Sequence, residues 1–358
     1  MFEKVNAGHP DKMADRLAGA VVDLVYERAG GLTKANPRVA CEVMAGHGRV
    51  DVQIETILGR LDLRADDVDP LIHRLFGERV VGNVLIAPQD PHLSDNQTRG
   101  LRCGDNGIFK GCPPTEEQRV LTAIAATMWE RWPYDGKYLI GDGNAIISKS
   151  SDGHLIVDAT ESRPKEQDNL KTVTICQSHA ETEDIYDFMR EFFAKNGGEI
   201  PTANDEWISK QAGIQSKATA AFLKGKCYAW GNTVNPLGPW TGGIDVDCGC
   251  TNRKLGSDMG DGVTGGGLMG KDLSKADVSV NIVCYLKAVA SGQVVTAICS
   301  IGDENVTFTY ADGTQETERF ADIVEQARLY ILTDCGGSFE TFACWGLLRP
   351  GAQVKSDE

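Results

Sequence analysis

The hydrophobic positions of this chain recur at two spacings, one typical of helices that pack on a core and one typical of strands. Helical spacing predicts helices over residues 11–28, 182–195, 274–290 and 320–332. Thr115 and Gln118 form a capping box, so a further helix is expected to begin there and to continue through Met128. Runs rich in β-branched and other apolar residues predict strands over residues 38–44, 49–57, 80–87, 137–148, 154–159, 171–177, 293–301 and 305–310.

Helices alternate with groups of strands three times along the chain. This order is typical of α+β proteins in which each sheet carries helices on one face. We therefore expect three similar α/β units in a pseudo-threefold arrangement. The regular pattern gives way to Asp, Asn, Gly and Pro between residues 89 and 111, and long irregular segments of this kind often act as lids.

The charge balance excludes two classes of partner. Of the 358 residues, 36 are Lys or Arg and 51 are Asp or Glu, so the formal net charge is −15. Such a chain lacks the broad basic surface that nucleic acids or anionic membranes require. The N-terminus has no apolar leader and no apolar run is long enough to cross a membrane, so we expect a cytoplasmic protein. The eleven cysteines are an odd number without zinc-site spacing, which favours reduced thiols.

Residues 238–270 hold eleven glycines, which allows backbone amides to come close to a ligand. Two motif matches in this segment are weak. Residues 260–265 fit the dinucleotide-binding pattern GxGxxG, but no hydrophobic strand precedes them. Residues 265–271 fit most of a P-loop, but Asp272 stands where a Ser or Thr hydroxyl would meet Mg²⁺. A P-loop ATPase is therefore a minor alternative.

The same segment carries cations that suit a polyphosphate. Lys271 and Lys275 are four residues apart and are expected to share one face of the first turn of a helix, where unpaired N–H groups also attract anions. Arg253 and Lys254 add two more positive charges. Solvated surface charges are the alternative interpretation for each cation taken singly.

His9 and Asp11 lie at the entrance of the first predicted helix. Asp11 could supply a hard oxygen ligand to Mg²⁺, which commonly binds one or two carboxylates together with substrate phosphates. A simple role in capping the helix is an equal alternative on residue types alone.

Several short motifs follow one another in a fixed order. They are GHPDK at residues 8–12 with Ala14 and Asp15, ACE at 40–42, GDNG at 104–107, DGK at 135–137, QSH at 177–179, DCG at 247–249 with Arg253 and Lys254, and GGG at 265–267 with Gly270, Lys271, Asp272, Ser274, Lys275 and Asp277. Together they resemble the signature of the S-adenosylmethionine synthetase (methionine adenosyltransferase) family. The resemblance extends from residue 1 to about residue 290, and the chain resembles a divergent and slightly short member.

The resemblance implies a reaction of ATP, L-methionine and water that gives S-adenosylmethionine, diphosphate and phosphate. The methionine sulfur would attack the 5′ carbon of ATP, and the displaced triphosphate would then be hydrolysed. A thioether has no proton to lose, so alignment and charge stabilisation would be the main tasks of the enzyme. The implied cofactors are Mg²⁺ and K⁺.

The resemblance also assigns roles to individual residues. The implied catalytic residues are His9, as a cationic or hydrogen-bonding imidazole near the leaving oxygen, with Lys137, Arg253, Lys254 and Lys271. The implied ATP-binding residues are these five together with Asp135, Trp240 and Asp247. The implied methionine-binding residues are Glu55, Gln89, Asp105, Asp247 and Lys275. The implied metal ligands are Asp11 and Asp277 for Mg²⁺ and Glu42 for K⁺.

The expected organisation follows from the same resemblance. The N-terminal unit is expected over residues 1–88, an active-site lid loop over 89–104, the central unit over 105–232, and the C-terminal unit with its phosphate-binding segment over 233–358. The family pattern implies a homodimer with shared active sites, or a dimer of such dimers. A regulatory subunit of the same family, which binds nucleotide or S-adenosylmethionine with little or no activity, is the main alternative.

The sequence departs from the family pattern near the expected site: the glycine-rich loop lacks a serine before Gly270, and four further residues differ. Asn106 replaces a glutamine, Pro239 an arginine, Asn252 a glycine and Val278 an arginine. None of these departures removes a residue that is expected to bind the triphosphate or Mg²⁺. We expect them to affect nucleotide selectivity, the behaviour of the lid and the catalytic rate.

Overall fold

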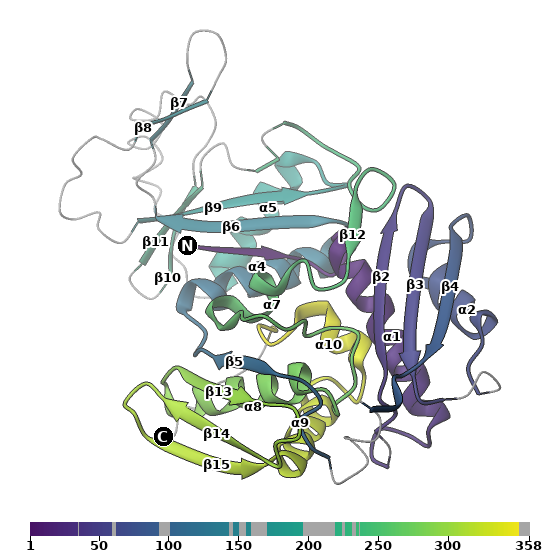
Figure 1. The fold of residues 1–358 in the computed structure, drawn as a ribbon. Coiled ribbons are helices and arrows are strands. Elements are labelled where there is room, and N and C mark those ends of the chain that lie inside the picture. The colour runs from purple at the N-terminus through teal and green to yellow at the C-terminus, as the bar shows by residue number, and fades with distance from the viewer. Residues whose placement is uncertain are drawn as a thin grey trace.

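A computed structural model describes the chain over residues 1–34, 36–58, 62–92, 101–142, 146–149, 155–158, 170–195, 219–223, 226–230, 234–235 and 237–350. The described strands form three larger sheets and one two-stranded sheet, with helices packed beside them (Figure 1). This mixture agrees with the predicted α+β class. No helix among the described residues is long and apolar enough to span a membrane.

The first sheet has the strand order β12-β2-β3-β4. Its strands are β2 (Ala40–Gly46), β3 (Arg49–Thr56), β4 (Val81–Pro88) and β12 (Cys248–Cys250). Helix α1 (Pro10–Arg28) packs on this sheet, with α2 (Ala65–Phe76) beside it. Val50, Val52 and Ile54 alternate along β3 and are buried, as the period of a half-covered strand requires.

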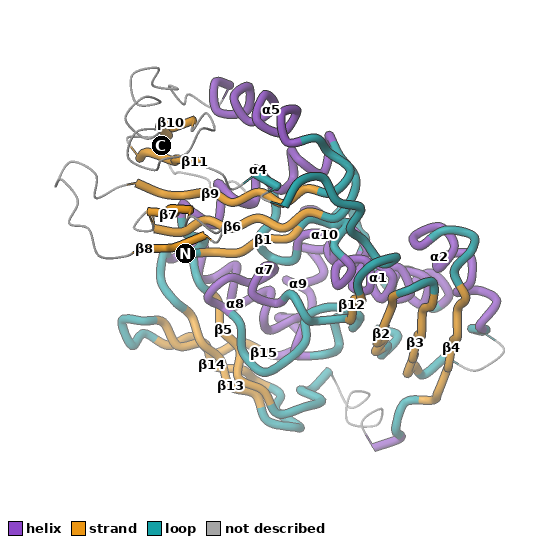
Figure 2. Tube along the Cα trace, turned by 90° about the horizontal axis from the view of Figure 1, so that it is seen from above, coloured by secondary structure: helices purple, strands orange, loops and turns teal. Residues whose placement is uncertain are grey.

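The second sheet has the order β1-β6-β9-β11-β10. Its strands are β1 (Phe2–Val5), β6 (Gly136–Asp142), β9 (Leu170–Gln177), β10 (Thr219–Leu223) and β11 (Lys226–Trp230). Helices α4 (Glu116–Arg131) and α5 (Thr182–Lys195) belong to this unit, and Figure 2 shows α5 beside the sheet. The predicted capping box is confirmed, because the Thr115 side chain accepts the Gln118 N–H and the Gln118 side chain accepts the Thr115 N–H. β7 (Ile146–Lys149) and β8 (Leu155–Asp158) form the separate hairpin.

The third sheet has the order β15-β14-β13-β5. Its strands are β5 (Gly107–Gly111), β13 (Val295–Cys299), β14 (Asn305–Tyr310) and β15 (Gln315–Arg319). Helices α8 (Ala276–Ser291), α9 (Phe320–Asp334) and α10 (Phe339–Trp345) complete this part of the molecule. α8 packs on β5 and on α9, while α10 packs on α1 (Figure 1).

Sheet membership does not follow the contiguous division of the chain at residues 88, 104 and 232. β1 joins the second sheet, β5 joins the third, and β12 returns to the first. Each of these strands has five residues or fewer, so its partner is set by long-range pairing rather than by local sequence. The predicted irregular segment 89–111 therefore ends in a strand, and residues 93–100 of the expected lid lie outside the described residues.

The glycine-rich segment contributes more to the core than its composition suggests. It contains the short helix α7 (Leu255–Met259) and the 3-10 helix η2 (Gly260–Gly262). Met259, Leu268 and Met269 are buried in the hydrophobic core. Because a helix rather than a strand precedes Gly260, the structural context that a dinucleotide-binding motif requires is not met.

Candidate active site

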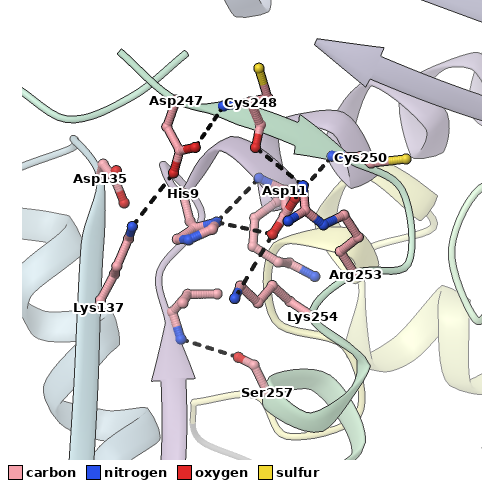
Figure 3. Close-up of polar contacts among 12 residues, drawn as sticks. His9, Asp11, Asp135, Lys137, Asp247, Cys248, Cys250, Arg253, Lys254 and Ser257 are labelled. Atoms are coloured by element: carbon pink, nitrogen blue, oxygen red, sulfur yellow. Dashed lines mark hydrogen bonds and ion pairs between the residues drawn. The ribbon is translucent and has the colours of Figure 1, made fainter. Parts of the chain in front are cut away.

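The first turn of α1 and strand β12 meet at the entrance of the candidate site (Figure 3). His9 caps α1, and its Nδ1 accepts a hydrogen bond from the Asp11 N–H at 3.1 Å. β12 crosses this turn so closely that Asp11 Oδ1 accepts the Cys250 N–H at 2.9 Å. Gly249 permits the crossing, since a Cβ there would lie 2.0 Å from the Pro10 carbonyl oxygen. The His9 and Asp11 side chains are therefore held by backbone groups.

The His9 imidazole is neutral at ordinary pH. Its side chain is buried, and burial is the main reason why its pKa falls to about 3, with Lys137 and Lys254 lowering it further. Because Nδ1 accepts a hydrogen bond, the ring proton is on Nε2. The lowered pKa favours the hydrogen-bonding imidazole over the cationic one among the two expectations for His9.

Three cations surround two carboxylates at this entrance. We call the following residues the first cluster: His9, Asp11, Lys137, Asp247, Arg253 and Lys254 (Figure 3). Asp11 Oδ1 lies 3.4 Å from Arg253 Nη1, and Asp11 Oδ2 lies 3.9 Å from Lys254 Nζ. Lys137 Nζ lies 3.7 Å from Asp247 Oδ2. These contacts are longer than strong charge-assisted hydrogen bonds, so the cations are held near an anion without being saturated by it.

Asp135 and Trp240 lie beside the first cluster. Asp135 Oδ2 accepts the Gly243 N–H at 3.1 Å, while Oδ1 is buried and has no hydrogen-bond partner within the described part of the chain. Burial raises the Asp135 pKa to about 6, against the opposing effect of the Gly243 hydrogen bond. The Trp240 ring is half-buried, with Lys137 Nζ 5.7 Å from its centroid. A buried carboxylate with one unpaired oxygen and a half-buried aromatic ring thus lie next to the cations.

A second group of charges lies around a cavity of about 680 Å³. We call the following residues the second cluster: Asp105, Lys271, Asp277 and the glycines at 265–267. Lys271 Nζ lies 2.6 Å from Asp277 Oδ2, and both side chains are about one-fifth exposed. Gly266 packs against the Asp277 carboxylate, since a Cβ there would lie 2.0 Å from Oδ1. This ion pair is short and closed, in contrast to the pairs of the first cluster.

Of the residues expected to bind methionine, Glu55, Asp105 and Lys275 lie near one another beside the second cluster. Burial lowers the pKa of Lys275, while the charges of Asp272, Glu55 and Asp105 oppose this effect. The opposing effect shows that Glu55 and Asp105 act on the same ammonium group. Gln89 is buried at the end of β4, where its N–H donates to the Thr56 carbonyl oxygen.

The expected arrangement of Lys271 and Lys275 on one helical turn is wrong. α8 begins at Ala276, so Lys275 is its N-cap residue and Lys271 lies five residues before the helix. The buried Asp272 carboxylate causes the difference, because it accepts the N–H groups of Val39 and Ser274 and holds the chain in a turn. Lys271 therefore pairs with β2 through a bridge to Ala40 rather than extending the helix.

A buried ionic group below the first cluster was not predicted from the sequence. Lys12 Nζ lies 3.0 Å from Asp15 Oδ2 and 2.7 Å from Asp258 Oδ2, and all three side chains are buried. Burial raises the Asp15 pKa to about 7, although Lys12 opposes this. Lys12 belongs to the GHPDK motif and Asp15 follows it. Their spacing of three residues on one predicted helix was the signal that could have indicated their contact. Asp258, 246 residues from Lys12, could not be inferred.

The candidate metal ligands Asp11 and Asp277 lie in different clusters of the chain. The sequence suggested that both would bind one Mg²⁺, but the ion pairs found among the described residues link Asp11 to Arg253 and Lys254, and Asp277 to Lys271. No group of three or more potential metal ligands occurs within the described ranges. Mg²⁺ commonly needs only one or two carboxylates and completes its shell with phosphate oxygens and water, so these two carboxylates still fit it chemically.

Three of the departures from the family pattern have a clear structural setting. Asn252 has a φ of +63°, the left-handed region that favours glycine and that asparagine tolerates best among other residues. Val278 is completely buried in α8, where an apolar side chain is suited. The Asn106 side chain accepts the Ile301 N–H at 3.0 Å and joins the residues just after the expected lid to the turn between β13 and β14.

Comparison with known proteins supports one family. No protein-family model matches the chain. An S-adenosylmethionine synthase of Jannaschia sp. (strain CCS1) is 26% identical over 77% of this chain and 69% of its own length. The S-adenosylmethionine synthase of a Nitratiruptor species is 25% identical, over 88% of this chain and 77% of its own length. The chain is thus similar to S-adenosylmethionine synthases over most of its length, which supports its place in that family.

Proposed function

We propose that this protein is a methionine adenosyltransferase that converts ATP, L-methionine and water into S-adenosylmethionine, diphosphate and phosphate. The observation that carries the proposal is the convergence of His9 and Asp11 with Lys137, Arg253 and Lys254 at one helix entrance, in a chain that is similar to S-adenosylmethionine synthases. The cations come from separate segments of the chain. Their loose pairing leaves them able to bind phosphate oxygens.

The first cluster would bind the triphosphate and the adenosine. Arg253 can bind two phosphate oxygens at once, while Lys137 and Lys254 act as point charges. Asp135 Oδ1 is buried without a partner among the described residues and would accept a ribose hydroxyl or an adenine N–H, and Trp240 would offer a face on which the base stacks. Asp247 lies beside Lys137 and would orient it.

His9 would stabilise the leaving oxygen of the triphosphate. Its Nε2–H is the one ring proton that the neutral side chain retains, and a donor aimed at a developing negative charge lowers the barrier more than it improves ground-state binding. A neutral donor does not lose its proton as pH changes within the physiological range. Catalysis at His9 should therefore not show the titration of an ordinary histidine.

The second cluster would bind the far end of the triphosphate and the methionine. Lys271 would leave Asp277 for a phosphate oxygen, and Asp105, Glu55, Gln89 and Lys275 would surround the amino acid. Asp247, which the sequence also assigned to methionine, belongs to the first cluster instead. Acidic groups beside the sulfur would favour the positive charge of the sulfonium product.

Asp11 and Asp277 would hold Mg²⁺, and Glu42 would hold K⁺. When bound, Mg²⁺ neutralises charge on the triphosphate oxygens. Glu42 is exposed on β2, and the Thr251 hydroxyl donates a hydrogen bond to its carboxylate. Glu42 therefore presents its carboxylate at the surface, whereas the Asp11 side chain is buried.

A homodimer with shared active sites would bring the two clusters together. The outer faces of the sheets carry exposed apolar residues that a second copy could cover: Met44, Val81, Leu85, Ile108, Leu139 and Ile298. Pairing the first cluster of one copy with the second cluster of its partner would complete one site. We also propose the pseudo-threefold arrangement of the units and the cytoplasmic location on the grounds given for the sequence.

A product assay tests the proposed function. The pure protein is incubated with ATP, methionine, Mg²⁺ and K⁺, and S-adenosylmethionine, diphosphate and phosphate are measured by mass spectrometry and ion chromatography. Production of all three in equal amounts is the expected result. ATP cleavage to ADP without methionine would instead indicate a P-loop ATPase.

The regulatory alternative predicts a different combination of results. A non-catalytic subunit would bind ATP or S-adenosylmethionine by calorimetry but would release no product over hours. The described residues retain the full first cluster, which favours catalysis over this alternative. Binding without turnover would overturn the proposed activity while leaving the family assignment intact.

A further inference from the structure

Asn252 connects the two loops that carry the candidate phosphate-binding cations. Its side chain makes two hydrogen bonds to one residue of the glycine-rich segment: Oδ1 accepts the Met269 N–H at 2.8 Å, and Nδ2 donates to the Met269 carbonyl oxygen at 3.2 Å. Gly267 packs against the same amide, since a Cβ there would lie 2.7 Å from its Cγ and Nδ2. The side chain thus pairs with Met269 as a neighbouring strand would.

The backbone of Asn252 is anchored at the same time. Its N–H donates to Asp15 Oδ1 at 2.8 Å, and Asp15 is held by the buried Lys12. The φ of +63° turns the chain so that the N–H points to Asp15 while the side chain points to Met269. One residue therefore ties the loop and the glycine-rich segment to the buried ionic group of α1.

The proposed phosphate ligands follow closely after each of the two residues that this contact joins, Asn252 and Met269. Arg253 and Lys254 come directly after Asn252, and Lys271 comes two residues after Met269. Between Met269 and Lys271, the Gly270 carbonyl oxygen accepts the Cys41 N–H at 2.7 Å. The main chain before Lys271 is thus fixed from one side by Asn252 and from the other by β2.

We propose that Asn252 is a positioning residue, which sets the backbone positions of Arg253, Lys254 and Lys271 for polyphosphate binding. The proposal rests on the proposed function for its kinetic consequence. The proposed role of Asn252 is the same whether the two clusters of one chain bind one triphosphate or two. Asn252 anchors both the loop with Arg253 and Lys254 and the loop with Lys271. The side chain itself need not touch the substrate.

Three variants of the full chain separate this role from simple stability. Asn252→Gly keeps the left-handed backbone but removes both side-chain hydrogen bonds. Asn252→Asp keeps an acceptor for the Met269 N–H and removes the donor to its carbonyl oxygen. Gln293→Ala is the matched control, because the Gln293 amide also makes two hydrogen bonds to a single residue, Asp312, but in an exposed turn.

Two measurements are made on each variant. Hydrogen–deuterium exchange of the peptide containing residues 265–271 reports on the loop, and kcat/KM for ATP together with the affinity for inorganic tripolyphosphate reports on binding. We expect Asn252→Gly to speed exchange in this peptide at least tenfold and to lower kcat/KM for ATP about tenfold or more, with KM for methionine changed less than threefold. Asn252→Asp should fall between Asn252→Gly and the wild type, and Gln293→Ala should match the wild type in both measurements.

The outcomes that overturn the proposal are distinct from failure of the proposed function. Faster exchange with unchanged kcat/KM and tripolyphosphate affinity would make Asn252 a structural brace only. Unchanged exchange would show that the amide does not hold the loop. If the wild-type protein makes no S-adenosylmethionine, the proposed function fails, and exchange with tripolyphosphate affinity still decides the role of Asn252.

Discussion

The two clusters hold their charges in different ways. In the first cluster, Asp11 and Asp247 lie 3.4 to 3.9 Å from their cations. In the second, Lys271 and Asp277 form a single pair at 2.6 Å. The carboxylates hold the cations of the first cluster only loosely, and Lys254 Nζ also lies 3.8 Å from Glu3 Oε1, whereas Lys271 and Asp277 neutralise each other as a close pair. An anion can therefore enter the first cluster directly, but it must compete with Asp277 to reach Lys271.

This difference indicates an order of events. A triphosphate would first be attracted to the first cluster, because unsaturated cations give the stronger field. Exchange of Asp277 for a phosphate oxygen at Lys271 would follow, with the freed carboxylate available as a cation ligand. Under the proposed function, the closed pair would keep Lys271 in place before the triphosphate binds.

The largest expected effect is that of Lys271→Ala. The variant removes the cation and also leaves Asp277 as an unpaired negative charge facing the triphosphate, so we expect kcat/KM for ATP to fall by about 10³-fold. Steady-state kinetics with both substrates checks this. Lys287→Ala is the control. Lys287 lies on α8, the helix that carries Asp277, and forms comparable ion pairs with Glu316 and Glu318 of β15, but it does not line the cavity of the second cluster. Wild-type activity of Lys271→Ala would show that the second cluster takes no part.

Asp11→Asn should have the next largest effect. The substitution keeps the size of the side chain but removes the negative charge between Arg253 and Lys254 and one candidate Mg²⁺ ligand. We expect kcat to fall by about 10²-fold, the range found when one electrostatic group is lost from an active site. Activity measured against Mg²⁺ concentration distinguishes the two causes, because a weakened metal site is partly restored by excess Mg²⁺ and a misplaced cation pair is not. Activity equal to that of the wild type at every Mg²⁺ level would remove Asp11 from the mechanism.

Local patterns predicted the elements whose sequence determines them. α1 and α4 were recognisable because each has an apolar face within one segment, and α4 also begins with the capping box of Thr115 and Gln118. β1, β5 and β12 were not assigned to their sheets, because strands of three to five residues depend on partners more than a hundred residues away. α2 was missed because only two of its residues, Val68 and Ile72, are buried and because Pro70 lies inside it.

In the candidate site, too, local sequence indicated some features, whereas others depend on distant partners. The identities of His9, Asp11 and Lys271 were taken from motifs, but no pattern indicated that they fall into two clusters. The contact of Asp11 with Cys250 spans 239 residues, and that of Lys12 with Asp258 spans 246. The turn at Asp272, which separates Lys271 from α8, depends on a hydrogen bond from Val39. Such contacts follow from the packing of sheets and could not be read from spacing.

Asp135, beside the first cluster, should make ATP binding depend on pH. Burial raises its pKa to about 6, so the carboxylate form is lost as pH falls through that value. If the ionised oxygen accepts a hydrogen bond from adenosine, KM for ATP should rise about tenfold between pH 7.5 and pH 5. Asp135→Asn should have a high KM that does not change over this range, and KM for methionine is the internal control. A wild-type KM for ATP that is constant down to pH 5 would exclude this role for Asp135.

Trp240→Phe should have the smallest effect. Phenylalanine keeps a face for stacking on adenine, so the loss is limited to the larger ring area and to the contact with Lys137. We expect kcat/KM for ATP to fall less than threefold, whereas Trp240→Ala should lower it about tenfold or more. Tryptophan fluorescence gives a second measurement: the change that ATP causes in the wild type should be absent from Trp240→Phe if the base stacks on this ring. A fluorescence change of the same size in both proteins would place the adenine elsewhere, while the triphosphate could still bind the first cluster.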